Sequence, residues 1–392
     1  MRSLPVPPRP TITTGVCLLL LAASTLRAQG PVDTSAVMLR ERPAYTDSVP
    51  LLGSFLATAL PGARVAIVHQ DRQELLIVHS NGKISTRVSL KAAEAPGLVA
   101  VSAARDTIAI LATNGYAASL RLFDFSGRVL GEVNLPEQAP GSNHVAIRAV
   151  AGGWVLSNRR FRRNGAPLTH PEHELLMVTI KGGVAEFATL GRWEEMTPLV
   201  KGRVVPWVHS LSLIVSASDG GGVFVSSALD YRFERIGSDG KRGDDVVLPA
   251  RPVAIPGNAR DRVLASIDTT YRSDSAFRDA VKHHLANLPL PPRSRTIAGA
   301  WLDSDGQLIV QRADVQGTLT PDGGTRVDVL RRGRLVRVVV LPPRHRILSV
   351  ADGVILTAVA DQTPAGSRLT RRDPLARQAY RLAAFALPWA PR

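Results

Sequence analysis

The sequence predicts an all-β fold: a six-bladed β-propeller with four-stranded antiparallel blades and one helical insertion. Three observations lead to this prediction. From about residue 52 onward, short runs rich in Val, Ile, Leu and Thr recur, and each run ends at Gly, Asp, Asn or Pro. Several runs share one ending, a Gly turn followed by an alternating strand and then Leu-Pro. The units return every ~40–50 residues, a period typical of propeller blades.

The first 28 residues have the pattern of a secretory signal peptide. Arg2 and Arg9 precede an apolar run with four consecutive Leu, and Ala28 offers a small residue before the cut. The run is too short to cross a bilayer, which takes ~20 apolar residues. We therefore expect a periplasmic or extracellular protein whose mature chain has no transmembrane segment. An uncleaved N-terminal anchor is the alternative.

The only cysteine, Cys17, lies in this N-terminal segment. A mature chain beginning at Gln29 would therefore have no disulfide, no thiolate metal site and no cysteine nucleophile.

Residues 29–51 form an N-terminal segment, and the propeller is expected over residues 52–392. The sixth unit has one strand fewer than the others. Residues 36–42 are expected to supply its outer strand, because closing the ring hides the edge strands. The six units span residues 52–91, 97–136, 144–191, 209–249, 296–342 and 345–388. A β-sandwich with a small second domain is the alternative fold.

The shared ending of the units has a physical reason at each position. It occurs as GRVLGEVNLP (127–136), GKRGDDVVLP (240–249) and GRLVRVVVLP (333–342). Gly adopts the positive φ of a tight turn, the strand alternates because one face is buried, and Pro ends the strand where no ladder donor is needed.

Residues 250–295 break the β pattern and predict a helical insertion between the fourth and fifth units. From Ser273 to Leu288 the apolar residues fall on one helical face. We expect one amphipathic helix, capped by Ser273 and stopped by Pro289.

Four stretches carry a family resemblance: LPGARVAIVHQDRQELLIVHSNGKI (60–84), AWLDSDGQLIVQ (300–311), GRLVRVVVLP (333–342) and ILSVADGVILTAVAD (347–361). With them the chain resembles the six-bladed β-propellers of the NHL/TolB-like group, especially its secreted bacterial members. The resemblance implies the fold over most of residues 52–388. Two features depart from it: Leu308 stands where an aromatic residue is usual, and the second and third units lack Asp-Gly turns.

The long irregular segments all fall on one predicted face, which we call the long-loop face. It carries the connections from an outer strand to the next inner strand and from the second to the third strand of a blade. The opposite face carries tight turns, and we call it the turn face. Because rigid scaffolds present binding residues on loops, we expect the central pocket on the long-loop face. The segments are residues 159–172, 191–208, 250–295, 313–324 and 361–372.

Arginines crowd these segments and predict an anion-binding surface. An Arg fork pairs with carboxylate or phosphate through two hydrogen bonds. A solvated Arg-rich surface is the alternative. The candidate binding residues are Arg159, Arg160, Arg162, Arg163, Arg260, Arg262, Arg371 and Arg372.

The net charge of +15 does not by itself predict a nucleic-acid partner. Of the 48 basic residues, only six are Lys, the charges are scattered along the chain, and no nucleic-acid-binding motif occurs. With 45% hydrophobic residues the chain is also not a disordered tail.

Two histidines, His170 and His173, are candidate metal ligands because Glu172 and Glu174 lie beside them. Pro171 prevents a helical pair of ligands at this position. Glu194 and Glu195 form an alternative acid–base pair. No serine-nucleophile, zinc-protease or P-loop motif occurs, and no cofactor is predicted.

These observations together predict an exported, non-catalytic binding propeller. An unknown protein or anionic ligand would dock on the long-loop face, and the propeller is expected to be a monomer. The alternative is a propeller enzyme of the lactonase, lyase or cyclotransferase type, which by family resemblance would hold a divalent metal at the channel mouth. No catalytic motif of these propeller enzymes matches residues of this sequence.

Overall fold

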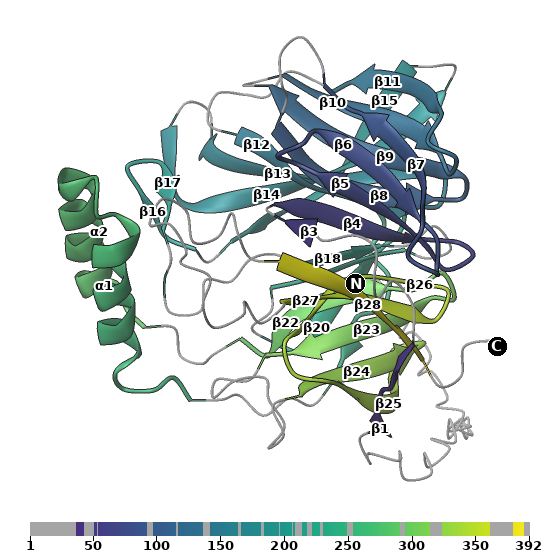
Figure 1. Cartoon of the computed structure of the whole chain (residues 1–392). Helices are drawn as coiled ribbons and strands as arrows, with labels where there is room; N and C mark the ends of the chain where they lie inside the picture. Colours follow the sequence, from purple (N-terminus) through teal and green to yellow (C-terminus); the bar gives the residue numbers. More distant parts are fainter. Residues whose placement is uncertain are drawn as a thin grey trace, which may run out of the picture.

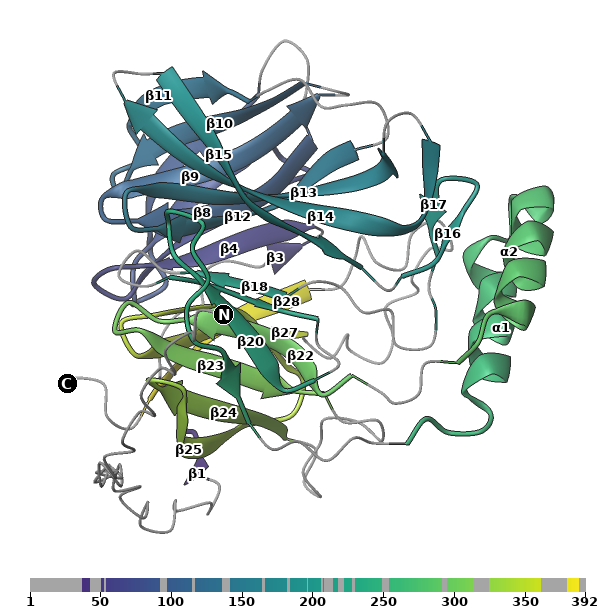
Figure 2. The same cartoon turned by 180° about the vertical axis from the view of Figure 1, so that it is seen from behind.

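The computed structural model describes most of the predicted propeller (Figures 1 and 2). The described residues are 37–42, 51–52, 54–91, 97–114, 117–135, 142–163, 166–181, 184–195, 197–205, 207, 214–217, 222–227, 230–248, 254–290, 295–313, 324–360 and 379–387. The predicted signal peptide lies outside them.

The chain folds into six antiparallel sheets, each a blade, arranged as a six-bladed propeller. Blade 1 contains β4 (Phe55–Leu60), β5 (Arg64–His69), β6 (Glu74–Val78) and β7 (Ile84–Ser89). Blade 2 contains β8 (Gly97–Ala104), β9 (Thr107–Asn114), β10 (Ala117–Asp124) and β11 (Val129–Asn134). Blade 3 contains β12 (Ser142–Val150), β13 (Gly153–Arg163), β14 (Ala166–Lys181) and β15 (Val184–Glu194).

The second half of the chain builds the other three blades in the same way. Blade 4 contains β18 (Ile214–Ala217), β19 (Val223–Ser226), β20 (Arg232–Ile236) and β21 (Val246–Val247). Blade 5 contains β22 (Ile297–Leu302), β23 (Gln307–Arg312), β24 (Thr325–Arg331) and β25 (Arg334–Leu341). Blade 6 contains β26 (His345–Ala351), β27 (Val354–Ala360) and β28 (Ala379–Ala386).

The first strand of every blade is the inner strand, and these six strands form the central ring. β4 contacts β8, and the contacts continue through β12, β18, β22 and β26 back to β4. Blades 3 and 6 therefore stand opposite each other across the channel. This arrangement confirms the predicted fold class, a six-bladed β-propeller.

The core lies between the blades. Six clusters of buried apolar side chains each join two neighbouring blades. In the interface of blades 5 and 6, for example, Ile309 and Val339 pack with Ile355 and Phe385. Both faces of each sheet are covered in this way, which explains why strands such as β27 are apolar throughout rather than alternating.

The N-terminal segment closes the ring, as predicted, but over two blades. β2 (Glu41–Arg42) pairs antiparallel with β28 and supplies the missing outer strand of blade 6. β1 (Val37–Met38) pairs in parallel with β25 and adds a fifth strand to blade 5. β3 (Leu51–Leu52) also pairs with β28. One short segment thus ties the last two blades together.

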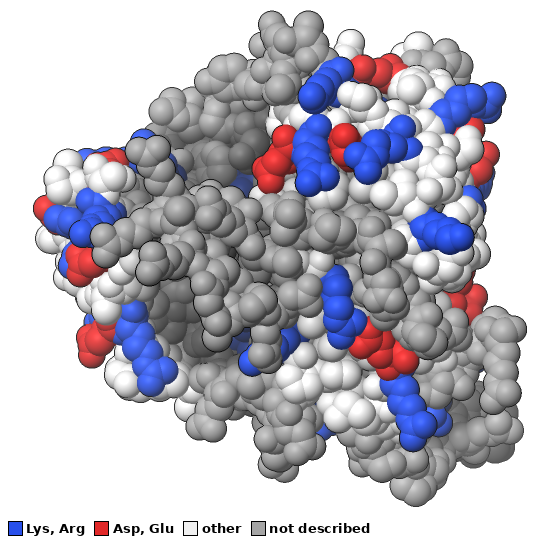
Figure 3. Space-filling view, viewed as in Figure 1, with Lys and Arg blue, Asp and Glu red and all other residues white. Residues whose placement is uncertain are grey.

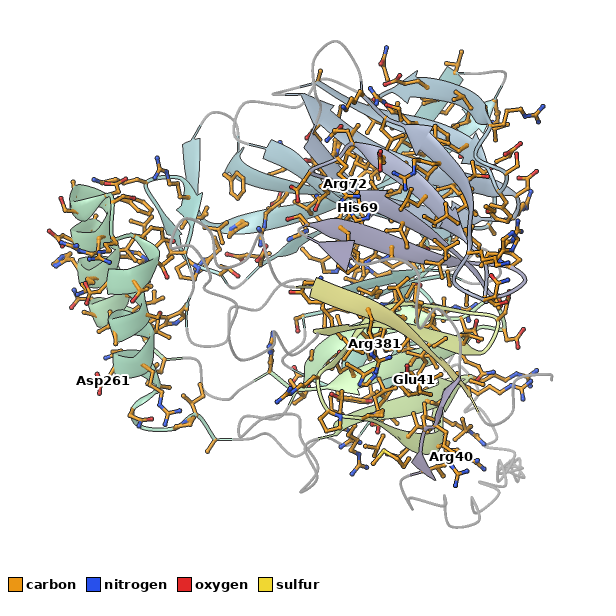
Figure 4. The ribbon with its side chains drawn as sticks, in the orientation of Figure 1. Arg40, Glu41, His69, Arg72, Asp261 and Arg381 are labelled. Atoms are coloured by element: carbon orange, nitrogen blue, oxygen red, sulfur yellow. The ribbon has the colours of Figure 1, made fainter. Side chains whose placement is uncertain are left out.

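A salt bridge fixes this closure. Glu41 and Arg381 lie side by side where the segment meets blade 6 (Figure 4). Arg381 donates from both terminal nitrogens, and the bond from Nη2 to Glu41 Oε2 is 3.1 Å long. Leu39 is buried beside it, and its N–H donates to Val340 O at 2.9 Å.

Substitution Glu41→Gln is expected to loosen the closure and to lower the free energy of unfolding by about 1–2 kcal/mol, because a charge-assisted, partly buried pair is lost. Amide hydrogen exchange at Leu39 should become faster. The control is Glu186→Gln, which removes an exposed pair with Lys181. Equal effects of the two substitutions would contradict a role for Glu41 in closure.

The insertion contains two helices where one was expected. α1 (Ala259–Thr270) was not predicted, and α2 (Ser275–Asn287) matches the predicted helix. The cap of α2 is Asp274 rather than Ser273, because the Asp274 carboxylate accepts the Phe277 N–H at 3.0 Å. Phe277, Val281 and Leu285 bury the inner face of α2.

The helices lie at the same end of the molecule as a small hairpin, β16 (Leu199–Val200) and β17 (Arg203–Val204) (Figures 1 and 2). They share an apolar cluster with Val200, Val205 and Trp207. None of the helices that the structure describes has the length and apolar character needed to cross a membrane.

The segment 159–172 was expected to be irregular, and the structure corrects this. β13 extends to Arg163 and β14 begins at Ala166, so the segment is the outer part of a long hairpin. Arg159 lies opposite His173, and Arg160 opposite Glu172. Such cross-strand pairs stabilise a ladder even where the strands are polar.

Candidate ligand-binding site

The predicted long-loop arginines that the structure describes are mostly engaged within the protein. Arg159 donates to both carboxylate oxygens of Glu195, and the bond from Nε to Oε2 is 2.7 Å long. Arg160 Nη1 lies 3.9 Å from Glu172 Oε1 and 3.8 Å from Glu174 Oε1. These two guanidinium groups are therefore neutralised by acids of their own blade.

The remaining predicted arginines do not form one cluster with them. Arg260, on α1, donates to Leu288 O at 2.8 Å, and its guanidinium lies 6.0 Å from the Trp207 ring centre. Arg262 is exposed on the same helix. The side chains of Arg162 and Arg163, and residues Arg371 and Arg372, lie outside the described structure. On the face shown in Figure 3, basic side chains alternate with acidic ones.

The two candidate metal-binding histidines contact different carboxylates. His170 Nδ1 lies 3.4 Å from Glu194 Oε1. His173 Nε2 lies 2.7 Å from Glu195 Oε2, and its Nδ1 lies 2.8 Å from Ser157 Oγ. Both ring nitrogens of His173 are thus occupied. Among the described residues, no three His, Cys, Asp or Glu side chains are grouped to hold a metal ion.

Glu195 is the centre of a buried network. It accepts hydrogen bonds from Arg159, His173 and Thr197, the last at 2.8 Å. Burial alone would raise its pKa, but the hydrogen bonds from His173 and Arg159 prevail and lower the pKa of Glu195 to about 2. The carboxylate is therefore ionised, so His173 Nε2 donates to it, and His173 Nδ1 shares a hydrogen bond with the Ser157 hydroxyl.

A cavity of about 280 Å³ lies where the six inner strands converge. Its walls are the last residues of these strands and the turns that follow them, so it opens on the turn face. We expected the central pocket on the long-loop face; much of that face lies outside the described residues, so that expectation stays a prediction, and the described cavity lies at the other end of the channel. The channel is open here because many wall residues are small: Ala57, Ala59, Ala103, Ala149 and Ala217.

Equivalent positions of the inner strands place polar side chains around this cavity. In five blades, the residue that lies two positions before the last paired residue of the inner strand faces the cavity. This position holds Thr58, Ser102, Arg148, Ala300 and Ser349, all of which line the cavity. Blade 4 contributes the neighbouring Ser216.

Arg148 brings a positive charge into this ring of small side chains. Its Nη1 donates to Ile147 O at 2.8 Å. In the part of the chain that the structure describes, no carboxylate lies within salt-bridge distance of its guanidinium. Burial lowers the pKa of Arg148 from its usual value, although an arginine stays protonated at neutral pH. The channel therefore contains a charge that lacks a counter-ion from the described protein.

The hydroxyl groups around the cavity are placed to donate. Ser102 Oγ accepts the Ala149 N–H at 3.1 Å, and Ser349 Oγ accepts the Ala59 N–H at 2.8 Å. These bonds fix the oxygens and leave the hydroxyl protons available to a ligand. Ser216 Oγ is buried, and the structure gives it no hydrogen-bond partner. An anion beside Arg148 would offer acceptors to the hydroxyls of Ser102 and Ser216 on the two neighbouring blades, whereas Ser349 lies across the channel in blade 6.

The sequence analysis missed Arg148, although a signal was present. It is the single charged residue in the inner strand SNHVAIRAV (142–150), at a position where three other inner strands carry Thr or Ser. The shared position becomes visible only when the six inner strands are aligned. The candidate arginines of the sequence analysis all came from the predicted loop segments, whereas Arg148 lies in a strand.

Comparisons with known proteins add little beyond the fold. No family model matches the chain, and no curated protein matches it closely enough to be related. Among solved structures, regucalcin from Agrobacterium tumefaciens, described as a calcium-binding protein, is 14% identical with a TM-score of 0.42. The match covers 91% of this chain and 98% of regucalcin.

Two further solved structures are similar to the same degree. A putative exported protein from Bacteroides fragilis is 11% identical, with 90% of this chain and 94% of that chain covered and a TM-score of 0.45. Virginiamycin B lyase from Staphylococcus aureus is 12% identical, with 88% and 98% covered and a TM-score of 0.37. Likeness at this level carries no argument about ligand or activity.

Proposed function

We propose that this protein is an exported, non-catalytic binding propeller that holds a small anionic ligand in its central channel. Arg148 carries the proposal, because it places a positive charge that has no counter-ion among the described residues in a cavity with hydroxyl donors. Pockets for small ligands typically measure ~300–1,000 Å³, so a cavity of about 280 Å³ favours a ligand of few atoms. The signal-like residues 1–28 support export. The repeated strand motifs support grouping with the NHL/TolB-like propellers.

Enzymatic activity has one observation in its favour, the chain Ser157–His173–Glu195. A hydroxyl that donates to a histidine held by a carboxylate is the arrangement of an activated nucleophile. Two features favour a structural role instead. Ser157 is only 3% exposed, and Arg159 already compensates the charge of Glu195. We therefore place binding before catalysis.

Thermal unfolding with added anions tests the proposal. Hexanoate, benzoate and inorganic phosphate are the probes, and hexylamine is the control of opposite charge. We expect at least one anion to raise Tm by more than hexylamine does. A ligand at ~100 times its Kd adds roughly 2.7 kcal/mol to the free energy of unfolding. The shift should shrink as NaCl increases, because salt screens the attraction to Arg148. Equal shifts with hexylamine, or no shift with any anion, would contradict the proposal.

A further inference from the structure

The charges that line the channel cavity are divided between its two sides. Arg148 in blade 3 and Arg105 at the end of the inner strand of blade 2 line one side. Asp352, in the turn that follows the inner strand of blade 6, lines the opposite side together with Ser304 of blade 5. Because blades 3 and 6 face each other across the ring, the cavity is basic on one wall and acidic on the other.

The acidic side is held in place by one buried and one exposed hydrogen bond. Asp303 is fully buried, and its Oδ2 accepts the Gly353 N–H from the neighbouring blade at 3.0 Å. Ser304 Oγ donates to Asp352 Oδ1 at 2.9 Å. Asp352 and Gly353 both have positive φ, 49° and 69°, as a tight two-residue hairpin turn requires. The turn and the hydrogen bond from Ser304 thus hold the Asp352 carboxylate at the rim of the cavity.

An indole ring also lines the cavity. Trp301, on the inner strand of blade 5, is half-buried and lines the same cavity. Its ring folds over Gly299, where a Cβ would come within 2.5 Å of the indole Cη2. Glycine at this position therefore lets the indole lie against the strand. An aromatic face beside a carboxylate suits an ammonium group, through cation–π attraction and a salt bridge.

We propose that the ligand of this cavity is a small zwitterion, with its carboxylate at Arg148 and its ammonium group at Asp352 and Trp301. The inference rests on the proposed function and names the ligand class of the same site. A plain monoanion would satisfy Arg148 but would bring no partner to Asp352. The Asp352 carboxylate at the rim would repel a ligand with several negative charges. An ω-amino acid and a short peptide share the required chemistry, since both separate the two charges by several bonds.

Isothermal titration with matched probes tests the inference. Hexanoate carries only the carboxylate, hexylamine only the ammonium group, and ε-aminohexanoate carries both. We expect ε-aminohexanoate to bind about tenfold more tightly than hexanoate, the value of one charge-assisted hydrogen bond. Triglycine presents the same two charges on a peptide. Its Kd relative to that of ε-aminohexanoate distinguishes a peptide ligand from an amino acid.

The variant Asp352→Asn should remove this tenfold preference and should not weaken hexanoate binding, because it takes only a negative charge from the cavity rim. Asn tolerates the left-handed conformation at this position, so the turn is kept. The control is Asp305→Asn, an exposed carboxylate near Ser304 that does not line the cavity. If hexanoate and ε-aminohexanoate bind the unmodified protein equally, the zwitterion inference fails while anion binding stands. If no probe binds, the proposed function itself fails.

Discussion

Replacement of Glu195 by glutamine is expected to lower the free energy of unfolding by about 3–5 kcal/mol, as for other buried charge pairs that lose one partner. The side chain of Glu195 is completely buried, while that of Arg159 is about one-fifth exposed. Without the carboxylate, Arg159 keeps its charge in a largely buried site, and one of the two oxygens that accept from Arg159, His173 and Thr197 becomes an NH2 donor. Urea unfolding measures the loss.

The neighbouring residue provides a matched control. Glu194 has a side chain that is 71% exposed, and its described partner is His170. Glu194→Gln makes the same chemical change one position away, and we expect a loss below about 1 kcal/mol, as for exposed ion pairs. Equal losses for the two variants would show that the buried network does not stabilise blade 3.

The network also predicts how stability depends on pH. The pKa of Glu195 is about 2 in the folded protein, against an ordinary value of 4.5. A lowered folded pKa stabilises the protein fully above pH ~4.5, and this contribution is lost as pH falls from about 4.5 towards 2. The wild-type protein should therefore lose more stability over that interval than Glu195→Gln does. If the free energies of unfolding of the two proteins fell equally over this pH interval, the lowered pKa of Glu195 would be contradicted.

The variant Arg148→Met is expected to change stability and binding in opposite directions. Without ligand, removal of a buried charge that lacks a described counter-ion should raise the free energy of unfolding by about 1–2 kcal/mol. Binding of an anionic probe should weaken at least ~30-fold, because the loss of one partner of a charge pair costs ~2–5 kcal/mol. Methionine keeps much of the length of the arginine stem.

The control for Arg148 is Arg87→Met on β7, the outer strand of blade 1. This arginine is half-exposed and pairs with Glu74 at 3.2 Å. The substitution removes one positive charge of the protein without touching the channel. We expect little change in stability and none in anion binding. If Arg87→Met weakened binding as much as Arg148→Met, the attraction would come from net charge rather than from the channel site.

The repeating units were predictable because their signals are local. Gly127, Gly240 and Gly333 all have positive φ in turns that precede an outer strand, as the Gly–strand–Leu-Pro pattern required. Closure by the N-terminal segment followed from counting strands. The second helix was missed because α1 is weakly amphipathic and contains six charged residues or hydroxyls on its exposed side, among them Arg262 and Asp268.

The site was less predictable, because charge pairing is a property of the fold. Arg159 and Arg160 have the sequence of a free basic cluster, yet Glu195, Glu172 and Glu174 neutralise them across strands. Arg148 is the single charged residue of an otherwise uncharged strand, and the sequence does not show where its side chain lies. The ring of six inner strands places it in the channel cavity. Residues distant in sequence decide both outcomes, and six inner strands must be in place before the cavity exists.

Titration of hexanoate into the wild-type protein and into Arg148→Met tests the central claim most directly. The account predicts binding that weakens with salt in the wild-type protein and is lost in Arg148→Met, while Arg148→Met remains folded and at least as stable without ligand. Equal affinity in both proteins would contradict the assignment of Arg148 as the residue that holds the anion.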